Sequence, residues 1–324
     1  MLKIVNNSTN PYFNLAAEEY VLKKFDEECF MLWRNEPCIV VGKNQNTLSE
    51  INEDYVKENN IIVVRRLSGG GAVFHDLGNL NFTFVANDDS KSFSDFKKFT
   101  QPIIDVLKTI DINAEFTGRN DLTIDGKKFS GNAQYKYKNR IFHHGTLLFT
   151  SNIKDLSGAL KVKKDKFKDK AVKSVKSRVT NISKHLKSPL TINEFMNLIM
   201  EHISKNPNVK EYIFTNEDIK NINKLVEDRY SKWEWNFGKS PKYTFKNEKK
   251  FKGGIIEAYL YVNKGIIESI DLYGDFFSAK DITDITKALT GIKHSREAII
   301  EALSSYNIND YFSNITLEEF MSLF

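Results

Sequence analysis

The sequence lacks the features that mark disulfide-rich, zinc-stabilised and membrane-spanning proteins. Its 324 residues include only two cysteines, Cys29 and Cys38, which are too few for a disulfide framework. They form no CxxC motif, and no HxxxH spacing is present, so we expect no structural zinc site. No run of about 18 apolar residues occurs, so we expect no transmembrane helix and no membrane partner.

Composition and charge are those of an ordinary globular protein. With 41% hydrophobic and 27% charged residues, the chain can bury the core of one large domain, or of a large and a small domain. The net charge of +5 is modest, and lysine fills eight of the sixteen positions 161–176, which weakens a nucleic-acid-binding interpretation. The first residues lack the basic and apolar segments of a signal peptide, so we expect a cytoplasmic location.

The most informative stretch is RRLSGGGAVFHDLGNLNFTF, residues 65–84. An apolar run precedes it and alternating residues end it, which predicts a strand, a glycine-rich loop and a second strand. Three successive glycines allow backbone N–H groups to converge on an anion, and Arg65 and Arg66 add permanent positive charge. The pattern is typical of a phosphate-binding loop, although a glycine-rich turn that binds nothing has the same composition.

A second informative stretch is GRNDLTIDGKKFSGNAQ, which begins at Gly118. Its Asp-Gly pair, residues 125–126, lies between alternating runs and predicts a β-hairpin with a two-residue turn. Period two then places Lys128 on the same face as Asp121, whereas Lys127 lies at the tip of the apolar face. Lys128 is the better candidate for chemistry, and the alternative is that it only forms a surface ion pair with Asp121.

Hydrophobic spacing predicts several further elements. Apolar residues in 13–24 recur at spacings of three and four, which predicts an amphipathic helix with Glu18 and Glu19 on its polar side. Residues 30–33 and 38–41 are short apolar runs separated by a turn-rich link. We expect these two runs to form a β-hairpin.

The C-terminal part of the chain predicts a separate small domain. Residues 239–252 are polar and basic and contain a proline, which is typical of a linker. After them the pattern restarts as two strands followed by helices, which predicts a small α+β domain. We therefore expect a catalytic domain at residues 1–246 and a C-terminal accessory domain at 247–324.

These motifs, in this order and spacing, resemble the lipoate–protein ligase A family. The match includes the two stretches above, FHHGTLLF after them, NPYFNLAAEEY near the start and WEWNFGKSP before the linker. It spans most of residues 10–241. The resemblance implies a biotin/lipoyl-ligase-like α+β fold with a mixed-sheet catalytic domain, and bacterial members of the family also carry a small C-terminal accessory domain.

The resemblance also implies an activity and its partners. Such an enzyme activates lipoate with ATP and Mg²⁺ to lipoyl-AMP and then transfers the lipoyl group to a lysine of a carrier protein. The implied carriers are lipoyl-domain proteins, namely the acyltransferase subunits of 2-oxoacid dehydrogenases and the glycine-cleavage H protein. A mobile lid, for which we expect residues 161–178, would shield the mixed anhydride from water.

The family motifs assign roles to individual residues. Lys128 is the implied catalytic residue, which would contact both the lipoate carboxylate and the α-phosphate. Asp121, with Asn120 beside it, is implied near the phosphates and Mg²⁺. The implied ATP- and adenylate-binding residues are Arg66, Gly71, Ala72, Val73, Phe74, Lys128 and Asp121. The implied lipoate-binding residues are Lys128, Gly70, His144 and Gly145.

Other functions remain open at the level of the sequence. Octanoyltransferases and lipoyl amidotransferases resemble these ligases but use a cysteine nucleophile and no ATP. In those relatives the cysteine follows the HHGT-type strand, where this chain has Thr150 and Ser151, and Cys29 and Cys38 lie far upstream. A non-catalytic relative that binds lipoyl domains is a further alternative. A biotin ligase usually carries a GRGRxGR motif, which is absent here.

Overall fold

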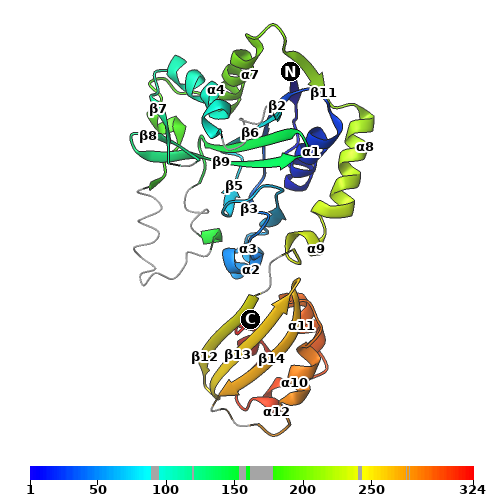
Figure 1. Ribbon diagram of the computed structural model, residues 1–324. Coiled ribbons are helices and arrows are strands. Elements are labelled where there is room, and N and C mark those ends of the chain that lie inside the picture. The colour runs from blue at the N-terminus through cyan, green and yellow to red at the C-terminus, as the bar shows by residue number, and fades with distance from the viewer. Residues whose placement is uncertain are drawn as a thin grey trace. The chain divides into compact units, whose positions relative to one another are not determined.

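The computed structural model describes residues 1–88, 95–118, 120–152, 158–160, 178–239, 243–274, 276 and 278–324. This part of the chain divides into two compact units, Met1–Lys232 and Trp233–Phe324 (Figure 1). The expected lid, residues 161–178, lies outside the described residues except for Arg178. Within the described ranges, every helix is too short or too polar to cross a membrane.

The larger unit is built on an eight-stranded sheet. In spatial order its strands are β11 (Lys210–Ile213), β1 (Leu2–Val5), β2 (Cys29–Arg34), β6 (Asn79–Asn87), β10 (Arg140–Leu148), β9 (Lys127–Tyr137), β8 (Asp121–Ile124) and β7 (Ala114–Thr117). β1 runs parallel to both of its neighbours, and the pairs that join β2 to β7 through the sheet are antiparallel. The mixed sheet and the accompanying helices confirm the predicted α+β class.

A second sheet of three strands carries the start of the glycine-rich stretch. Its spatial order is β4 (Ile62–Arg65), β3 (Cys38–Val41) and β5 (Val73–His75). The predicted hairpin between residues 30–33 and 38–41 is wrong, because β2 belongs to the large sheet and β3 to the small one. The link between them carries the chain from one sheet to the other, and its Asn35 side chain is fully buried. The strand, glycine loop and strand predicted around residues 65–84 are confirmed.

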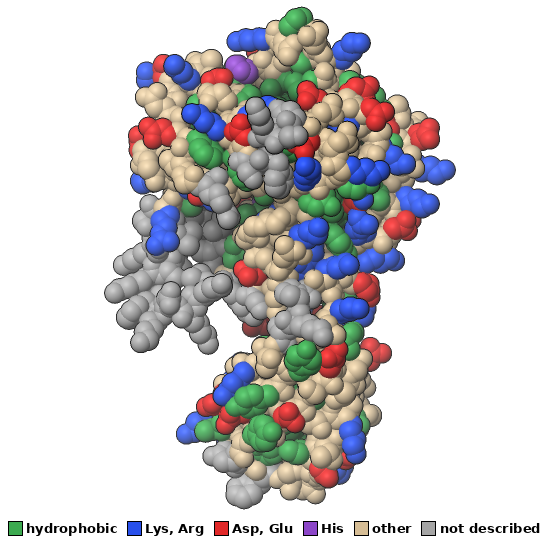
Figure 2. Space-filling model, in the orientation of Figure 1, with side chains coloured by type: hydrophobic (Ala, Val, Ile, Leu, Met, Phe, Trp, Pro, Cys, Tyr) green, Lys and Arg blue, Asp and Glu red, His purple; other side chains and the backbone are tan. Residues whose placement is uncertain are grey.

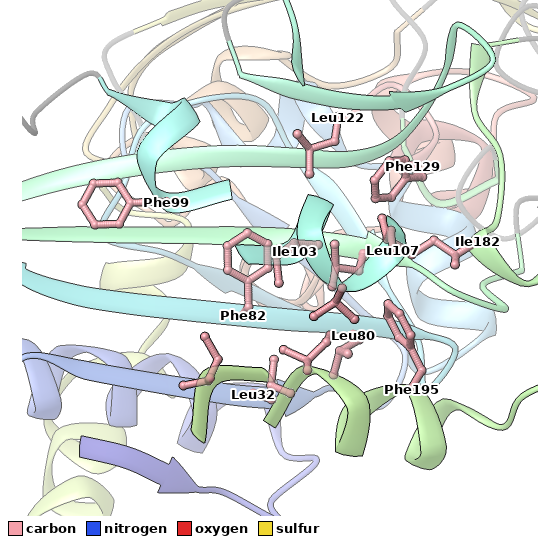
Figure 3. Close-up of a cluster of buried hydrophobic side chains, with 14 of the residues drawn as sticks. Leu32, Leu80, Phe82, Phe99, Ile103, Leu107, Leu122, Phe129, Ile182 and Phe195 are labelled. Atoms are coloured by element: carbon pink, nitrogen blue, oxygen red, sulfur yellow. The ribbon is translucent and has the colours of Figure 1, made fainter. Parts of the chain in front are cut away.

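Two helices, α4 (Phe96–Thr109) and α7 (Ile192–Ser204), pack on each other and cover the sheet beside β7 and β1 (Figure 1). Their apolar faces meet the strands in one buried cluster, which includes Phe82, Leu107 and Phe195 (Figure 3). α7 begins at the capping box that its sequence predicts, with Thr191 and Glu194 bonded to each other's backbone. The shorter helices of this unit are α2 (Thr47–Glu50), α3 (Glu53–Glu58) and η1 (Ile182–His185).

Helix α1 (Pro11–Lys24) follows the predicted range, but the prediction of a polar side at Glu18 and Glu19 is wrong. These two side chains are 2% and 1% exposed. Helix α8 (Asn216–Leu225) and the π-helical turn η2 (Val226–Tyr230) pack against α1. Periodicity along α1 carries no information about these elements, which lie about 200 residues further along the chain.

Glu19 is the centre of a buried charge network. Arg229 Nη1 donates to both carboxylate oxygens at 2.6 and 2.7 Å, and the Tyr230 hydroxyl donates at 2.8 Å. Lys23 Nζ adds a hydrogen bond of 2.6 Å. Burial alone would raise the pKa of Glu19, but the hydrogen bonds from Lys23 and Tyr230 and the charge of Arg229 outweigh it and hold the pKa below its usual value.

The smaller unit contains an antiparallel sheet with helices packed on it. The strands are β12 (Tyr243–Phe251), β13 (Gly254–Asn263) and β14 (Ile266–Gly274). The helices are α9 (Trp233–Asn236), α10 (Thr283–Leu289), α11 (Arg296–Leu303), α12 (Ile308–Tyr311) and α13 (Leu317–Met321). The prediction of a linker at 239–252 is wrong, because most of this range forms the edge strand β12. Lysines suit an edge strand, since they hinder pairing with further strands.

We expect Glu19→Gln to lower the free energy of unfolding near pH 7 by about 1–2 kcal/mol, because charged hydrogen bonds are lost while Lys23 and Arg229 remain partly exposed. The Glu19 pKa is lowered in the folded state, so its stabilisation is present above about pH 4.3 and is lost as the pH falls towards the lowered value. The difference between wild type and variant should therefore shrink in acid.

Denaturant unfolding at several pH values measures this difference. Glu115→Gln is the matched control, because Glu115 is exposed. A Glu19→Gln deficit that stays constant from neutral pH down to strongly acidic pH would contradict the role of the carboxylate charge.

Candidate functional site

A pocket of about 180 Å³ lies between the two sheets of the larger unit. Its walls come from β3 and β5 of the small sheet and from β2, β6, β9 and β10 of the large sheet. Helix α1 and the glycine loop, residues 66–72 between β4 and β5, complete the walls. The lining residues are Leu15, Trp33, Val40, Arg66, Gly70, Gly71, Ala72, Val73, His75, Asn81, Asn120, Lys128, Gly131, Asn132, Ala133, His144, Gly145 and Thr146. The two stretches that the sequence analysis singled out therefore meet at one cavity.

Most of the predicted site residues line this pocket. They are Arg66, Gly70, Gly71, Ala72, Val73, Asn120, Lys128, His144 and Gly145. Phe74 and Asp121 are not among the lining residues. Phe74 is 4% exposed and lies on the opposite face of β5 from Val73, because successive side chains of a strand alternate. Asp121 instead forms an ion pair with Lys128.

Arg66 holds the glycine loop in shape. Its Nη2 donates to the carbonyl oxygens of Gly69 and Gly71 at 2.6 and 2.8 Å. Its Nη1 donates to the carbonyl oxygen of Val40 at 3.1 Å, and its Nε donates to Ser68 Oγ at 3.0 Å. Four of the five N–H groups of this guanidinium thus bond to the protein itself.

This arrangement sets the direction of the loop amides. The C=O and N–H of a trans peptide point in opposite directions, so the N–H groups of Gly70 and Ala72 point away from the guanidinium of Arg66. Burial lowers the pKa of Arg66 to about 10, and the negative charge of Glu18 opposes this shift. The guanidinium therefore stays charged at neutral pH and keeps its hold on the loop.

Arg65 anchors the neighbouring loop, residues 42–46. This fully buried side chain donates to the carbonyl oxygens of Gly42 and Gln45 at 2.9 and 2.8 Å and to Thr47 Oγ1 at 2.7 Å. The two loops touch, since a Cβ added to Gly42 would lie 2.1 Å from the carbonyl oxygen of Gly70. Only glycine fits at position 42, and the glycine loop is thereby braced from behind.

The hairpin that carries Lys128 has the predicted turn but not the full predicted register. Asp125 and Gly126 have φ values of 49° and 71°, as a two-residue turn of type I′ requires. A two-residue turn predicts Leu122 opposite Phe129, yet Leu122 pairs with Ser130. A β-bulge at this point adds one residue to β9, so strict alternation fails beyond Lys128.

Lys128 forms the expected ion pair and also lines the pocket. Its Nζ lies 2.7 Å from Asp121 Oδ1, and the two side chains are 41% and 36% exposed. The side chain lies over Gly131, where an added Cβ would be 3.0 Å from Nζ. Lysine and arginine side chains are frequent on the surface of this unit (Figure 2). What distinguishes Lys128 from the exposed Lys127 is its position at the pocket wall.

A buried hydrogen-bond chain connects α1 to the glycine loop through His144. Ser68 Oγ accepts from Arg66, so its hydroxyl proton is free to be donated to His144 Nε2 at 2.7 Å. His144 Nδ1 then donates to Glu18 Oε1 at 3.1 Å. Because Ser68 is fully buried, this chain does not present a nucleophile. It fixes the orientation of His144 and ties β10 to the loop.

Sequence analysis did not assign nine of the eighteen lining residues to the site, among them Trp33 and His75. Trp33 was assigned only to a core strand. His75 lies on β5, a strand that the sequence analysis did not predict, and it shares the face of Val73 because it is two residues further along that strand. Glu18, which orients His144, was also missed because its partners are distant in sequence.

The two ends of the pocket differ in chemistry. Strands β2, β6, β10 and β9 are successive neighbours, so β2 and β9 are separated by three strand spacings, or about 14 Å. The β2 end carries the aromatic side chain of Trp33, and the β9 end carries Lys128. Leu15 and Val40 are further apolar residues of the lining. Such a cavity suits an elongated molecule with an apolar tail and an anionic head.

We expect Gly145→Ala and Gly71→Ala to differ in stability. A Cβ on Gly145 would lie 2.1 Å from Asn132 Oδ1 and 2.5 Å from Phe82 Cε1, so this variant should lose about 1–3 kcal/mol of unfolding free energy. A Cβ on Gly71 would meet no heavy atom within 4 Å beyond its chain neighbours, so that variant should stay within about 0.5 kcal/mol of wild type. Chemical denaturation measures both, and equal destabilisation would contradict the packing assigned to Gly145.

Two family models match the chain. Residues 10–204 match the lipoyl protein ligase A/B catalytic domain, and residues 240–324 match the bacterial lipoate protein ligase C-terminus. Lipoate–protein ligase 1 of Staphylococcus aureus is 48% identical over 320 residues, which is 98% of this chain and 98% of the relative. A lipoate–protein ligase of Bacillus subtilis is 48% identical over 329 residues, covering 100% of this chain and 99% of the relative.

Solved structures agree with this result. A bipartite lipoate protein ligase from Thermoplasma acidophilum, described with its E2 lipoyl domain, matches with a TM-score of 0.68 and 30% identity over 75% of this chain and 97% of that chain. Plasmodium falciparum LipL1 in complex with lipoate has a TM-score of 0.64 and 28% identity, over 99% and 97% of the two chains. A lipoate–protein ligase A bound with ATP has a TM-score of 0.64 and 26% identity, over 73% and 98%. By sequence over its whole length and by fold, this chain belongs to the lipoate–protein ligase family.

Proposed function

We propose that this pocket activates lipoate with ATP to lipoyl-AMP and that the protein then transfers the lipoyl group to a lysine of a carrier protein. The observation that carries the proposal is the convergence of Lys128 and the glycine loop on one cavity whose other end is apolar. A solved relative holds ATP and another holds lipoate, which supports the assignment of the same substrates here.

Lys128 supplies what this reaction requires of the protein. Lipoate carboxylate and ATP are both anions, so their mutual repulsion must be neutralised before the carboxylate can attack the α-phosphate. An ammonium group placed between them stabilises the charge that moves in the transition state. The ion pair of Lys128 with Asp121 is partly exposed and therefore weak, so Nζ can exchange this partner for substrate oxygens.

The glycine loop provides the second set of donors. The N–H groups of Gly70 and Ala72 point away from Arg66, and the open space beside Gly71 lets a phosphate approach the backbone. We assign Arg66 to ATP binding through the loop that it holds, and Val73 and Phe74 to the same site through the backbone that continues it. Gly70 would serve the acyl group as well as the phosphate.

The apolar end of the pocket receives the acyl chain. Trp33 lies at this end, Leu15 and Val40 are further apolar residues of the lining, and each CH₂ group buried against such residues contributes about 0.8 kcal/mol. His144 and Gly145 form the strand wall beside the chain. Gly145 is required there, since a side chain would displace Asn132 or Phe82.

The residues at the charged end fit a Mg²⁺ ion that is held mainly by nucleotide phosphates. Mg²⁺ commonly takes one or two carboxylates and completes its shell with phosphate oxygens and water. Among the described residues no group of three or more His, Cys, Asp or Glu is placed to hold a metal, so an all-protein cage is not offered there. Asp121, with one carboxylate oxygen on Lys128, is the ligand we assign. Such an ion would neutralise phosphate charge.

We further propose which carrier proteins are modified and which role each part of the chain has. The carriers are the acyltransferase subunits of 2-oxoacid dehydrogenases and the glycine-cleavage H protein, in the cytoplasm. The Thermoplasma acidophilum ligase is described together with an E2 lipoyl domain, which supports this class of partner. The larger unit, Met1–Lys232, would carry out catalysis, and the smaller unit, Trp233–Phe324, would act as an accessory domain. The expected boundary between residues 246 and 247 falls inside β12 and is therefore moved to this division.

A cysteine-dependent transferase is less well supported by this site. Such an enzyme needs a reactive thiolate. Both cysteines are buried, and burial raises the pKa of Cys29 to about 12 and raises the pKa of Cys38 further still. Neither cysteine lines the pocket.

Replacement of Lys128 tests the activation step. We expect Lys128→Ala to slow pyrophosphate release from ATP and lipoate by about a hundred- to a thousandfold, as for the loss of one preorganised donor. Its melting temperature should stay close to that of wild type, because the ion pair is partly exposed. Lys127→Ala is the matched control, since this adjacent lysine is exposed and not part of the pocket wall. Near-normal turnover by Lys128→Ala would remove Lys128 from the mechanism.

Transfer is tested separately. The full-length protein is incubated with an apo lipoyl domain, lipoate, ATP and Mg²⁺, and the domain is then weighed by mass spectrometry. We expect the mass increase of one lipoyl group on the acceptor lysine, and no increase when ATP is omitted. Modification that does not depend on ATP would favour the transferase alternative.

A further inference from the structure

His75 is a pocket residue with an unpaired ring nitrogen. It lies on β5, is 3% exposed and lines the cavity. Its Nδ1 contacts the Asn35 side chain at 3.1 Å, whereas its Nε2 is buried without a hydrogen-bond partner among the described residues. A buried polar atom normally has a partner in the protein or in a ligand or water. The pocket beside His75 is the place where such a partner can be supplied.

A chain of buried amides determines which ring nitrogen carries the proton. Its first links start from groups whose role as donor or acceptor is fixed. The backbone N–H of Ser8 donates to Asn6 Oδ1 at 3.1 Å, so the Asn6 amide nitrogen donates to Asn14 Oδ1 at 3.0 Å. Asn14 Nδ2 also donates to the backbone carbonyl oxygen of Arg34 at 2.8 Å, which fixes the same orientation independently.

The last links reach the imidazole. Asn14 Nδ2 donates to Asn35 Oδ1 at 2.8 Å, so the amide nitrogen of Asn35 faces His75 Nδ1. This nitrogen is a donor, and Nδ1 must accept. The proton of the neutral ring therefore lies on Nε2.

The ring stays neutral at physiological pH. Burial lowers the pKa of His75 to about 3, and the positive charge of Arg66 adds to this shift. An imidazolium would also force its Nδ1–H against the donor of Asn35. His75 thus presents one N–H donor and no charge.

The position of His75 identifies which part of a ligand it meets. Along β5 it lies two residues, or about 6.7 Å, beyond Val73, on the side away from the glycine loop. Its ring centroid is 6.1 Å from that of Trp33, at the β2 end of the pocket. The donor is therefore placed in the apolar part of the cavity, near the tail of the acyl chain and not near its carboxylate.

We propose that His75 is a specificity-determining residue whose Nε2–H donates to a sulfur atom of the lipoate ring and so favours lipoate over octanoate. This inference rests on the proposed function. The two acids have the same number of chain carbons, but only lipoate carries hydrogen-bond acceptors at the tail. Sulfur is a weak acceptor, yet octanoate offers none, and it would leave the buried donor unpaired or trap a water molecule beside a methyl group.

Two substitutions distinguish the effect of the Nε2–H donor from the effect of the hydrogen bond between His75 and Asn35. In His75→Asn the new amide oxygen can accept from Asn35, as Nδ1 does, but no group reaches the former position of Nε2. In His75→Gln the longer side chain places its amide nitrogen near the former Nε2. The first variant removes the donor while retaining the contact with Asn35, and the second retains a donor in the pocket. Melting temperatures establish that both variants fold.

The measurement is kcat/KM for pyrophosphate release with lipoate and with octanoate. We expect wild type to prefer lipoate and His75→Asn to lower the lipoate-to-octanoate ratio about five- to tenfold, the loss of one ordinary hydrogen bond. His75→Gln should keep most of the wild-type ratio. A purely structural role of His75 would lower kcat/KM for lipoate and for octanoate by the same factor. A folded His75→Asn variant with an unchanged ratio would therefore overturn this inference but leave the proposed function standing. A wild type that activates neither acid would overturn the proposed function and the inference with it.

A second readout does not depend on turnover. Nitrogen-15 NMR of the histidine-labelled protein reports the protonation of each ring nitrogen. We expect a protonated Nε2 and a bare Nδ1 for His75 in the free protein, with a larger shift of the Nε2–H proton on addition of lipoate than of octanoate. A protonated Nδ1, or equal shifts with the two acids, would overturn the inference.

Discussion

The pocket depends on hydrogen bonds from two buried guanidinium groups to main-chain carbonyl oxygens. Arg66 holds the glycine loop from within, and Arg65 holds the loop at residues 42–46 against which it packs. A buried cation is costly unless polar groups surround it, so these carbonyls and the arginines stabilise each other only in this arrangement. The loop therefore reaches the pocket already shaped, and its amides need little reorganisation to meet an anion.

The cations of the site have different tasks because they differ in burial. Arg66 is 6% exposed and uses four N–H groups within the protein, so it shapes the site. Lys128 is half-exposed and has only a weak pairing with Asp121, so it can exchange that partner for a substrate. A charge that both built the loop and met the substrate would have to break its structural bonds in each turnover.

Helix α1 organises both walls of the pocket through polar side chains. Its Glu18 orients His144, which in turn bonds to Ser68 at the glycine loop. Its Asn14 donates to Asn35, and the amide nitrogen of Asn35 in turn donates to His75 Nδ1. Each chain is buried and directional, because every member is either donor or acceptor at a given contact. The helix thus helps to determine which ring nitrogen of His144 and of His75 carries the proton.

The sequence by itself determined the local elements and the two motifs, because turn chemistry and hydrophobic period act within a few residues. The Asp-Gly turn, the glycine loop and the helix at 13–24 were predictable for that reason. Only the tertiary structure decided that Glu18 is buried, that β2 and β3 enter different sheets, that the basic range before residue 252 forms an edge strand, and that His75 lines the pocket. Each of these facts depends on partners brought together by folding across long stretches of chain, and no local pattern encodes a partner that is distant in sequence.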